Sequence, residues 1–140
     1  MPLAPRSADA PAAEPAELRL SLVPGRFAIC RLPAAAVPPS PPPGAALWSL
    51  TRSAEELSLV LPEEYADRRW RVEAGYRCFV VQGPLPFSAV GILARLSGAL
   101  AAAGVPLFAV STFDTDYLLV PDEHLQAAVA ALQESGCRVG

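Results

Sequence analysis

The sequence predicts an α+β fold made of two unequal halves. From Tyr76 onward, the periodicity of apolar residues gives the order strand, helix, strand, strand, helix, strand. Residues 17–72 supply strand patterns but no helix, and a proline-rich segment at 33–44 lies where a helix would otherwise be expected. We therefore expect a ferredoxin-like βαββαβ sandwich at 73–140, preceded by a degenerate, mostly β copy of the same unit.

Composition limits the classes of function. The chain has 140 residues, and 52% of them are hydrophobic, enough to form a core in one compact domain or two very small units. A net charge of −3 does not provide the basic surface that nucleic acid requires, so no nucleic-acid partner is expected. The only basic cluster, Arg68, Arg69 and Arg71, is expected to be a solvated edge or turn.

Neither a metal centre nor a cofactor is expected. A structural zinc site needs about four closely spaced Cys or His ligands. Here the three cysteines are far apart, and His124 is the only histidine. Cys30, Cys78 and Cys137 are therefore expected to be buried, reduced thiols.

No membrane segment is expected either. The longest apolar run, 90–107, is interrupted by polar residues and a proline. Residues 1–16 are rich in Ala and Pro and lack the apolar segment of a signal peptide, so we expect a disordered tail. Without an export signal, the cytoplasm is the expected compartment.

The first half is predicted from strand and turn signals. Residues 18–32 alternate between apolar and polar on both sides of Pro24-Gly25, which predicts a hairpin or two consecutive strands. Six of the twelve residues at 33–44 are proline, so this segment is expected to be a polyproline-like surface connection, either a plain linker or a ligand for a proline-binding partner. Two further strands are expected at Leu47–Arg52 and Glu56–Leu61.

The second half opens with a strand signal at Tyr76–Gly83, where successive residues are expected to point to opposite faces of the sheet. The next segment, Pro86–Gly104, has helical spacing, and its final glycine is placed to end the helix. Its expected apolar stripe consists of Ala89, Leu93, Leu96, Leu100 and Ala103, widened by Ile92 and Ala99.

The remaining elements complete the sandwich. Two strands, Val105–Thr112 and Thr115–Val120, are expected to be joined by a short turn at Phe113-Asp114. A second helix is predicted from Pro121 to about Ser135, because proline suits a first helical position and acidic residues follow it, where they favour the helix dipole. Residues 137–139 are expected to form a short last strand.

The loop VVQGPLPFS, between the strand at 76–83 and the helix, could hold an anion on the free N–H groups of a helix N-terminus. It partly resembles the acylphosphatase loop through Val81, Gln82, Gly83 and Phe87. However, Ser88 stands where that family has the arginine that binds the acyl phosphate, and the chain contains no asparagine to position a water. Acyl-phosphate hydrolysis is therefore disfavoured, and no enzymatic activity is expected.

Three stretches resemble the ACT-domain family more closely. They are ALWSLTRSAEELSLVLPEEY, the stretch from VQGPLPFS through STFDTDYLLV, and the helix start PDE at 121–123. The resemblance covers about Leu18–Val139, is strongest from Gln82 to Val120, and points to the branch with small bacterial two-ACT proteins and cytosolic arginine sensors. It implies an ACT sandwich at 73–140 and a degenerate ACT-like unit at 17–72.

The resemblance also implies where a ligand would bind. ACT domains bind regulatory amino acids at an interface between ACT units, so a small amino acid and a homodimer are expected. One wall would be the loop and the helix start, and the other would be the start of the second strand, often from the facing unit. Relatives often carry an acidic residue where this chain has Pro86. By motif the two walls correspond to Leu85, Phe87, Ser88 and Gly91, and to Pro106 and Leu107.

Four polar residues near the predicted turn were also weighed for a functional role. Asp114 is expected in the turn and Asp116 at the strand start. They are either a turn bond and an edge charge, or they hold a ligand amine or a partner's arginine. Ser111 and Thr112 either bond within the sheet or contact the ligand, and Ser88 either caps the helix or bonds the ligand.

The predicted function is therefore a non-catalytic regulatory module that binds a small amino acid or a similar metabolite. The alternative is a structural ACT-like dimerisation module that uses the same surfaces without a ligand.

Overall fold

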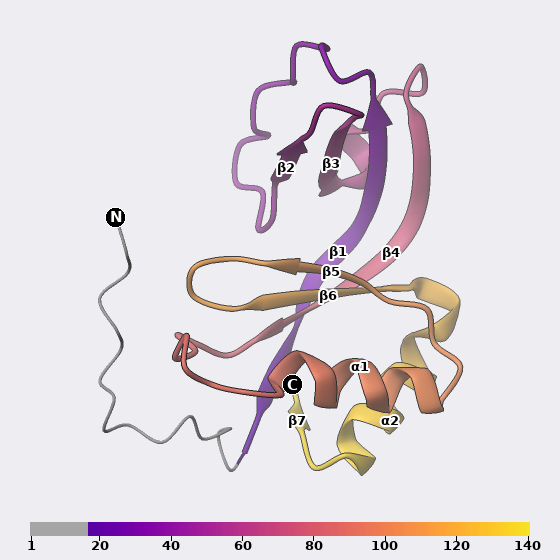
Figure 1. The fold of residues 1–140 in the computed structure, drawn as a ribbon. Coiled ribbons are helices and arrows are strands. Elements are labelled where there is room, and N and C mark those ends of the chain that lie inside the picture. Colours follow the sequence, from indigo (N-terminus) through magenta and orange to yellow (C-terminus); the bar gives the residue numbers. More distant parts are fainter. Residues whose placement is uncertain (1–16) are drawn as a thin grey trace.

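The structure, a computed structural model, describes residues 17–140 and contains one seven-stranded sheet and two α-helices (Figure 1). The elements are β1 Arg19–Leu32, β2 Ser49–Arg52, β3 Leu57–Pro62, β4 Arg71–Val81, α1 Ile92–Ala102, β5 Phe108–Ser111, β6 Asp116–Pro121, α2 Leu125–Glu134 and β7 Arg138–Val139, with short 3-10 turns η1 Glu63–Tyr65 and η2 Asp122–His124. The strand order is β2-β3-β1-β4-β6-β5, and β7 pairs with β1. The predicted tail at 1–16 lies outside the described residues.

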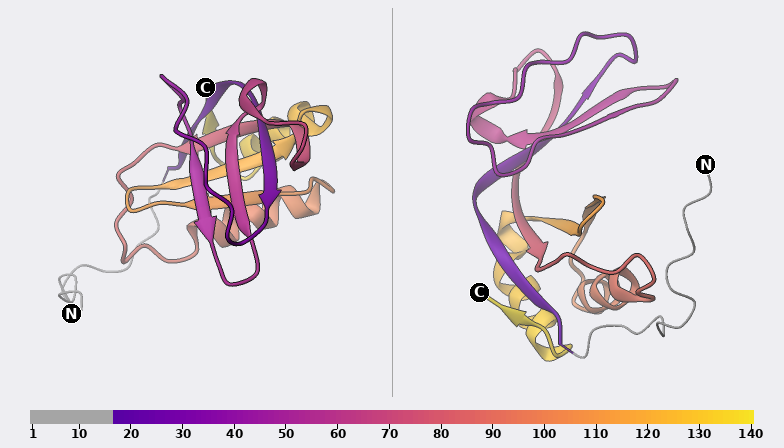
Figure 2. Two further views of the ribbon diagram at one scale, coloured as in Figure 1. Left: turned by 90° about the horizontal axis from the view of Figure 1, so that it is seen from above. Right: turned by 90° about the vertical axis from the view of Figure 1, so that its left-hand side faces the viewer.

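The second half forms the ferredoxin-like sandwich that the sequence predicts. Its elements follow the order β4-α1-β5-β6-α2-β7, and both helices pack on the same face of the sheet (Figure 2). β6 pairs antiparallel with both β4 and β5. The last strand, β7, pairs in parallel with the start of β1, which itself pairs with the end of β4. The first half of the chain therefore contributes a strand segment to the sheet of the second.

An apolar core joins the two helices to the sheet. Phe79 and Val81 of β4 point towards the helices, whereas Cys78 and Val80 point to the opposite face, as the predicted alternation requires. The buried positions of α1 recur every four residues, so they form one stripe on the helix. Two residues of the predicted stripe fall outside α1, because Ala89 precedes the helix and Ala103 follows it. The fully buried helical residues are Leu96, Leu100, Ala128 and Leu132.

β1 is one continuous strand, so the predicted hairpin at Pro24-Gly25 is wrong. The turn residues instead form a bulge, at which the register with β4 shifts between Val23 and Phe27. Gly25 has a φ of 87°, a left-handed conformation that glycine adopts without steric cost. The guanidinium of Arg26 then reaches Asp122 at 3.0 Å, which ties the bulge to the second half.

The first half contains the predicted strands and, within the described residues, no α-helix. β2 begins at Ser49 rather than Leu47, and β4 begins at Arg71 rather than Tyr76, so β4 runs through both halves like β1. The segment 33–44 crosses the surface as an irregular connection, with Val37 87% exposed. Beneath it lies a separate apolar cluster built mainly from Cys30, Leu32, Leu57, Leu59 and Leu61.

The two halves repeat one another around a point in the sheet. Phe27 of β1 faces Pro62 of β3, just as Tyr76 of β4 faces Pro121 of β6, and Phe27 and Tyr76 are themselves paired. The paired strands also read alike, LVLPEEY in the first half and LLVPDEH in the second. We therefore propose that the chain divides into ACT-like units at 17–72 and 73–140, which exchange the halves of their long strands.

The structure also bears on the expected state of the cysteines and on the expected lack of a membrane segment. Cys30, Cys78 and Cys137 are free and buried, as predicted. Burial raises the pKa of Cys30 to about 11 and that of Cys78 to about 12, so these two thiols stay protonated at neutral pH. Within residues 17–140, neither helix has the length and apolar character needed to cross a membrane.

Arg52 anchors the proline-rich segment, and its removal gives a first prediction. Its guanidinium donates to the carbonyl oxygens of Ala34 and, at 2.8 Å, Ala36. We expect Arg52→Ala to lower the free energy of unfolding by about 1 kcal/mol, because these exposed hydrogen bonds are partly replaced by water. We also expect faster cleavage of 33–44 by elastase, which cuts after small residues, because the freed segment opens more often.

The matched control for this prediction is Arg68→Ala. Arg68 is exposed and makes no hydrogen bond or ion pair within the described part of the chain. Equal melting temperatures and equal cleavage rates for the two variants would contradict an anchoring role for Arg52.

Candidate functional site

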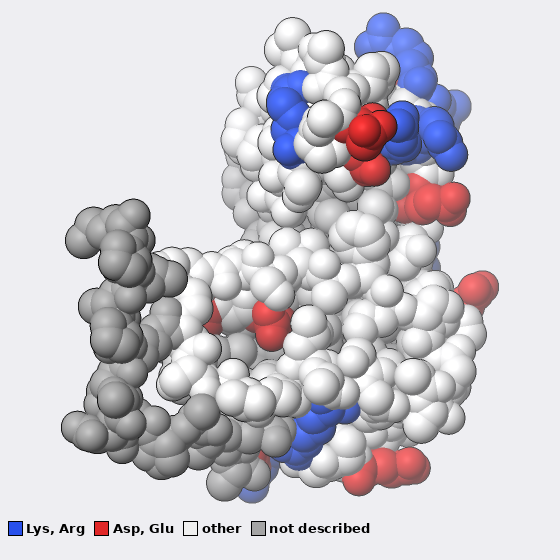
Figure 3. Space-filling view, in the orientation of Figure 1, with Lys and Arg blue, Asp and Glu red and all other residues white. Residues whose placement is uncertain are grey.

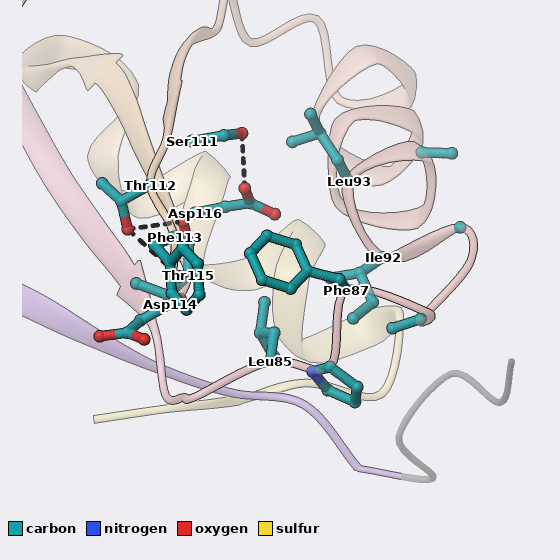
Figure 4. A pocket seen from close by; sticks show the side chains of 14 residues that line it. Leu85, Phe87, Ile92, Leu93, Ser111, Thr112, Phe113, Asp114, Thr115 and Asp116 are labelled. Carbon is teal, nitrogen blue, oxygen red and sulfur yellow. Dashed lines mark hydrogen bonds between the residues drawn. The ribbon is translucent and has the colours of Figure 1, made fainter. Parts of the chain in front are cut away.

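An open cleft of about 430 Å³ lies between the N-terminal end of α1 and the turn that joins β5 to β6 (Figure 4). This volume is within the range of small-molecule sites. The cleft is lined by the loop after β4, the first turn of α1 and the strand ends at the turn, namely Leu85, Pro86, Phe87, Ala89, Gly91–Ala94 and Ser111–Asp116.

The loop after β4 is fixed to the β5–β6 turn through its backbone. The N–H of Leu85 donates to the carbonyl oxygen of Asp114 at 2.7 Å. The hydroxyl of Thr115 donates to the carbonyl oxygen of Val81, which holds the same turn against the end of β4. A Cβ atom at Gly83 would lie 2.9 Å from the Asp114 oxygen, so only glycine permits this close approach. The loop after β4, which forms one wall of the cleft, is therefore held in place by the β5–β6 turn, which forms the other wall.

The helix begins later than the sequence predicts. Gly91 is the N-cap residue, and its φ of 84° is incompatible with a right-handed helix, so α1 starts at Ile92 rather than near Pro86. The first helical bond runs from the N–H of Arg95 to the carbonyl oxygen of Gly91. The capping role predicted for Ser88 is wrong, because no side chain caps the helix and Ser88 lies in the preceding turn.

The uncapped helix start presents donors to the cleft. The N–H groups of the first helical turn have no partner within a helix, and the residues that carry them line the cleft. They also lie at the positive end of the helix dipole. This end of the cleft is consequently suited to a carboxylate or another small anion. The residues concerned are Ile92, Leu93 and Ala94.

A carboxylate lies on the opposite wall. Asp116 is the first residue of β6 and pairs with Ser111, whose hydroxyl donates to the Asp116 Oδ1 at 2.6 Å. The Asp116 side chain is directed into the cleft, whereas that of Asp114 is directed away from it (Figure 4). The N–H of Thr112 donates to the carbonyl oxygen of Thr115 at 2.8 Å, which closes the turn between the strands, as predicted.

Two phenylalanines stand at the mouth of the cleft. The rings of Phe87 and Phe113 meet edge to face, with centroids 4.6 Å apart and an interplanar angle of 88°. Their exposed fractions are 50% and 75%, and Val90 nearby is 64% exposed. Exposed apolar groups gathered at a cleft are typical of surfaces that bind a ligand or another protein chain.

The charges of the cleft are complementary to those of a zwitterion. Within the part of the chain that the structure describes, its lining contains carboxylates but no Lys or Arg. In the space-filling view, acidic side chains lie beside the β5–β6 turn, and the largest group of basic side chains lies on the first half of the chain (Figure 3). An α-amino acid carries a carboxylate that suits the helix start and an ammonium group that suits Asp116.

The residues that the sequence singled out fall into two groups. Leu85, Phe87, Gly91, Ser111, Thr112 and Asp114 line the cleft, and Ser88 lies next to it without lining it. Pro106 and Leu107 follow the C-terminal end of α1 and precede β5, at the opposite end of the helix from the cleft. These two residues can therefore reach a cleft of this kind only in a second copy of the chain.

Two residues of the lining were not among the predicted site residues. Phe113 was assigned only to a turn, and Asp116 was weighed both as an edge charge and as a holder of a ligand amine. Residues 111 and 116 pair across the hairpin, so a two-residue turn at 113–114 would have placed both side chains on one face. The length of this turn was therefore the feature of the sequence from which the position of Asp116 beside Ser111 could have been inferred.

The sequence model of the ACT domain matches residues 71–134. A segment of 50 residues, 36% of this chain, is 40% identical to the human cytosolic arginine sensor for mTORC1 subunit 1. The chain covers only 15% of that sensor's length.

Solved structures extend the likeness to most of the chain. Protein Atu0741 from Agrobacterium tumefaciens is 33% identical, with a TM-score of 0.82 over 89% of this chain and 92% of that one. The regulatory subunit of aspartate kinase from Thermus thermophilus is 13% identical, with a TM-score of 0.61 over 83% of this chain and 95% of that one. The second likeness concerns the fold alone.

Proposed function

The chain belongs to the ACT-domain family, and we propose that it is a regulatory module that binds a small amino acid in the cleft between α1 and the β5–β6 turn. The observation that carries this proposal is the opposition of the uncapped helix start to the Asp116 carboxylate across one cleft. The ligand carboxylate accepts from the N–H groups of the first helical turn, and the ligand ammonium donates to Asp116. No catalytic step is part of this function.

The name of one similar protein supports the class of ligand, because that protein is an arginine sensor. The sensor is matched over a short segment, so its name supports amino-acid binding here and not a particular amino acid. The sensor is cytosolic by name, which supports a cytoplasmic location for this chain.

We further propose that a second copy of the chain closes the cleft, giving a homodimer. Phe87 and Phe113 leave apolar surface exposed at the mouth, which a second chain would remove from water. Pro106 and Leu107 lie at the far end of the same helix, so an antiparallel arrangement of two chains would bring them to each other's cleft. In this arrangement, Ser88 would lie at the border of the contact between the two chains.

The exposed aromatic pair also supports a second candidate function, a dimerisation module that binds no ligand. In that case Phe87 and Phe113 contribute only to the contact between chains. The two functions differ in whether an amino acid stabilises the folded protein.

The test of amino-acid binding is a thermal-shift screen of the full chain with each of the twenty amino acids. At about 100 times its dissociation constant, a ligand adds about 2.7 kcal/mol to the free energy of unfolding, which corresponds to a rise of about 10 °C for a chain of this size. We expect Gly91→Leu to abolish the rise, because a leucine side chain there would project at the helix start. No rise with any amino acid would favour the ligand-free dimerisation module.

Gly91→Leu needs a control for its effect on the backbone, because its φ of 84° strains any larger residue. Gly75→Leu is that control, since Gly75 has a φ of 79° and also has open space around it, but lies in β4 away from the cleft. Both variants should lower the melting temperature of the free protein by similar amounts. Only Gly91→Leu should lose the rise caused by the ligand.

A further inference from the structure

We infer that the amino acid bound in this cleft has an uncharged, apolar side chain, an inference that rests on the function proposed above. The cleft volume of about 430 Å³ exceeds what the zwitterionic part of an amino acid needs, so its lining also determines which side chain is accepted. Around the polar groups that would bind the zwitterion, the lining is apolar and includes Leu85, Phe87, Ile92, Leu93 and Phe113.

The lining offers no partner for an acidic side chain. Among residues 17–140, no Lys or Arg lines the cleft. Arg95 is the only charged residue of α1, and its guanidinium donates to the carbonyl oxygen of Ser135 at 2.8 Å, on the side of the helix that faces α2. A second ligand carboxylate would therefore lose its water without gaining a charged partner, which disfavours aspartate and glutamate.

The lining also offers too few acceptors for a basic side chain. Asp116 is the only carboxylate directed into the cleft from the described residues, and the side chain of Asp114 is directed away (Figure 4). One oxygen of Asp116 already accepts from Ser111. The remaining oxygen meets the α-ammonium group, so a guanidinium or a second ammonium would be left without a charged acceptor.

A second copy of the chain would not change this balance. The proposed second wall, Pro106-Leu107, lies within residues 96–113, a run of eighteen residues without a single Asp, Glu, Lys or Arg. A facing chain that presents this run closes the cleft with apolar and small polar groups. Side-chain selection is therefore dominated by the burial of apolar surface, about 25 cal/mol for each Å² removed from water.

The test compares ligands of similar size and different charge by isothermal titration calorimetry of the full chain. Leucine, asparagine and aspartate form one set, and methionine, glutamine, glutamate and lysine form another. We expect leucine and methionine to bind about tenfold or more tightly than every other member of their sets, from the burial of about two methylene groups. Equal or tighter binding of asparagine, aspartate, glutamine, glutamate or lysine would overturn the inference but leave the proposed function standing. Binding of none of them would overturn both.

A variant that adds a positive charge to the cleft tests the same inference from the protein side. Ala94 is exposed and lines the cleft, so Ala94→Arg would add a cation without disturbing the core. We expect glutamate to gain about tenfold or more in affinity from the new ion pair, and methionine to gain nothing. Ala101→Arg, on an exposed position at the other end of α1, should leave both affinities unchanged. A variant that binds glutamate no better than the native chain would contradict a side-chain pocket at this wall.

Discussion

Replacing Asp116 with asparagine should weaken the binding of the amino acid by about tenfold to a hundredfold. A hydrogen bond to a charged group contributes about 1.5–3 kcal/mol, and asparagine keeps the shape of the side chain while it removes the charge that attracts the ammonium group. The amide oxygen of asparagine can still accept from the hydroxyl of Ser111, so the hairpin should persist. The affinity is measured by calorimetry with the amino acid that gives the largest thermal shift.

Asp114→Asn is the matched control, because it makes the same chemical change two residues away. The Asp114 side chain is directed away from the cleft, and its contribution to the loop is a carbonyl oxygen that the substitution retains (Figure 4). We expect its affinity for the ligand to remain within about twofold of the native value, corresponding to a change below about 0.5 kcal/mol. If Asp114→Asn weakened binding more than Asp116→Asn, the ammonium group would belong at Asp114, and the proposed orientation of the ligand would be wrong.

The sequence predicts the second half well because each of its elements has a local cause. The alternation in Tyr76–Gly83 and the four-residue spacing from Ile92 to Leu100 are properties of one strand and one helix, and the structure confirms both. The order of these elements then leaves few ways to cover one face of an antiparallel sheet. The family resemblance pointed to the same sandwich, which the comparisons confirm.

The errors arise where the backbone conformation depends on distant residues. Pro24-Gly25 reads as a turn, but β3 and β4 hold both sides of it in one sheet, so it becomes a bulge. Gly91 lies within a stretch with helical spacing, and its left-handed conformation delays the helix. The orientation of Asp116 follows from the register between β5 and β6, which depends on the length of the turn at 113–114 and not on the alternation within either strand.

The comparison of the two halves explains why we assign one cleft to each chain. In the second half, the loop after β4 leads to a helix whose first turn lines the same cleft as the hairpin turn. In the first half, the corresponding loop after β1 leads into the proline-rich segment, and Arg52 of the hairpin binds its carbonyl oxygens. An anion has no helix start to bind in the first half. The degenerate unit would then serve mainly as a support for β1 and β4.

Phe79→Ala should be the most destabilising of these substitutions, and we expect it to lower the free energy of unfolding by about 3–5 kcal/mol. Phe79 is completely buried, and it faces Leu22 of β1 and Leu118 of β6 on either side. The cavity left by its ring would lie beneath both helices, in the cluster that holds α1 against the sheet. Because typical domains have only about 5–15 kcal/mol of stability, a large part of the total would be lost.

Phe113→Ala is the matched control, because it removes a phenylalanine ring from the surface instead of the core. The comparison separates the effect of burial on stability from the effect of losing an aromatic ring. Phe113 is 75% exposed, so this change should alter the free energy of unfolding by less than about 0.5 kcal/mol. Urea titrations of both variants, followed by circular dichroism, measure the two values. A loss below about 1 kcal/mol for Phe79→Ala would mean that α1 is not held mainly by this core. Since the first turn of α1 forms a wall of the cleft, Phe79→Ala should also weaken the ligand's thermal shift, although Phe79 does not line the cleft.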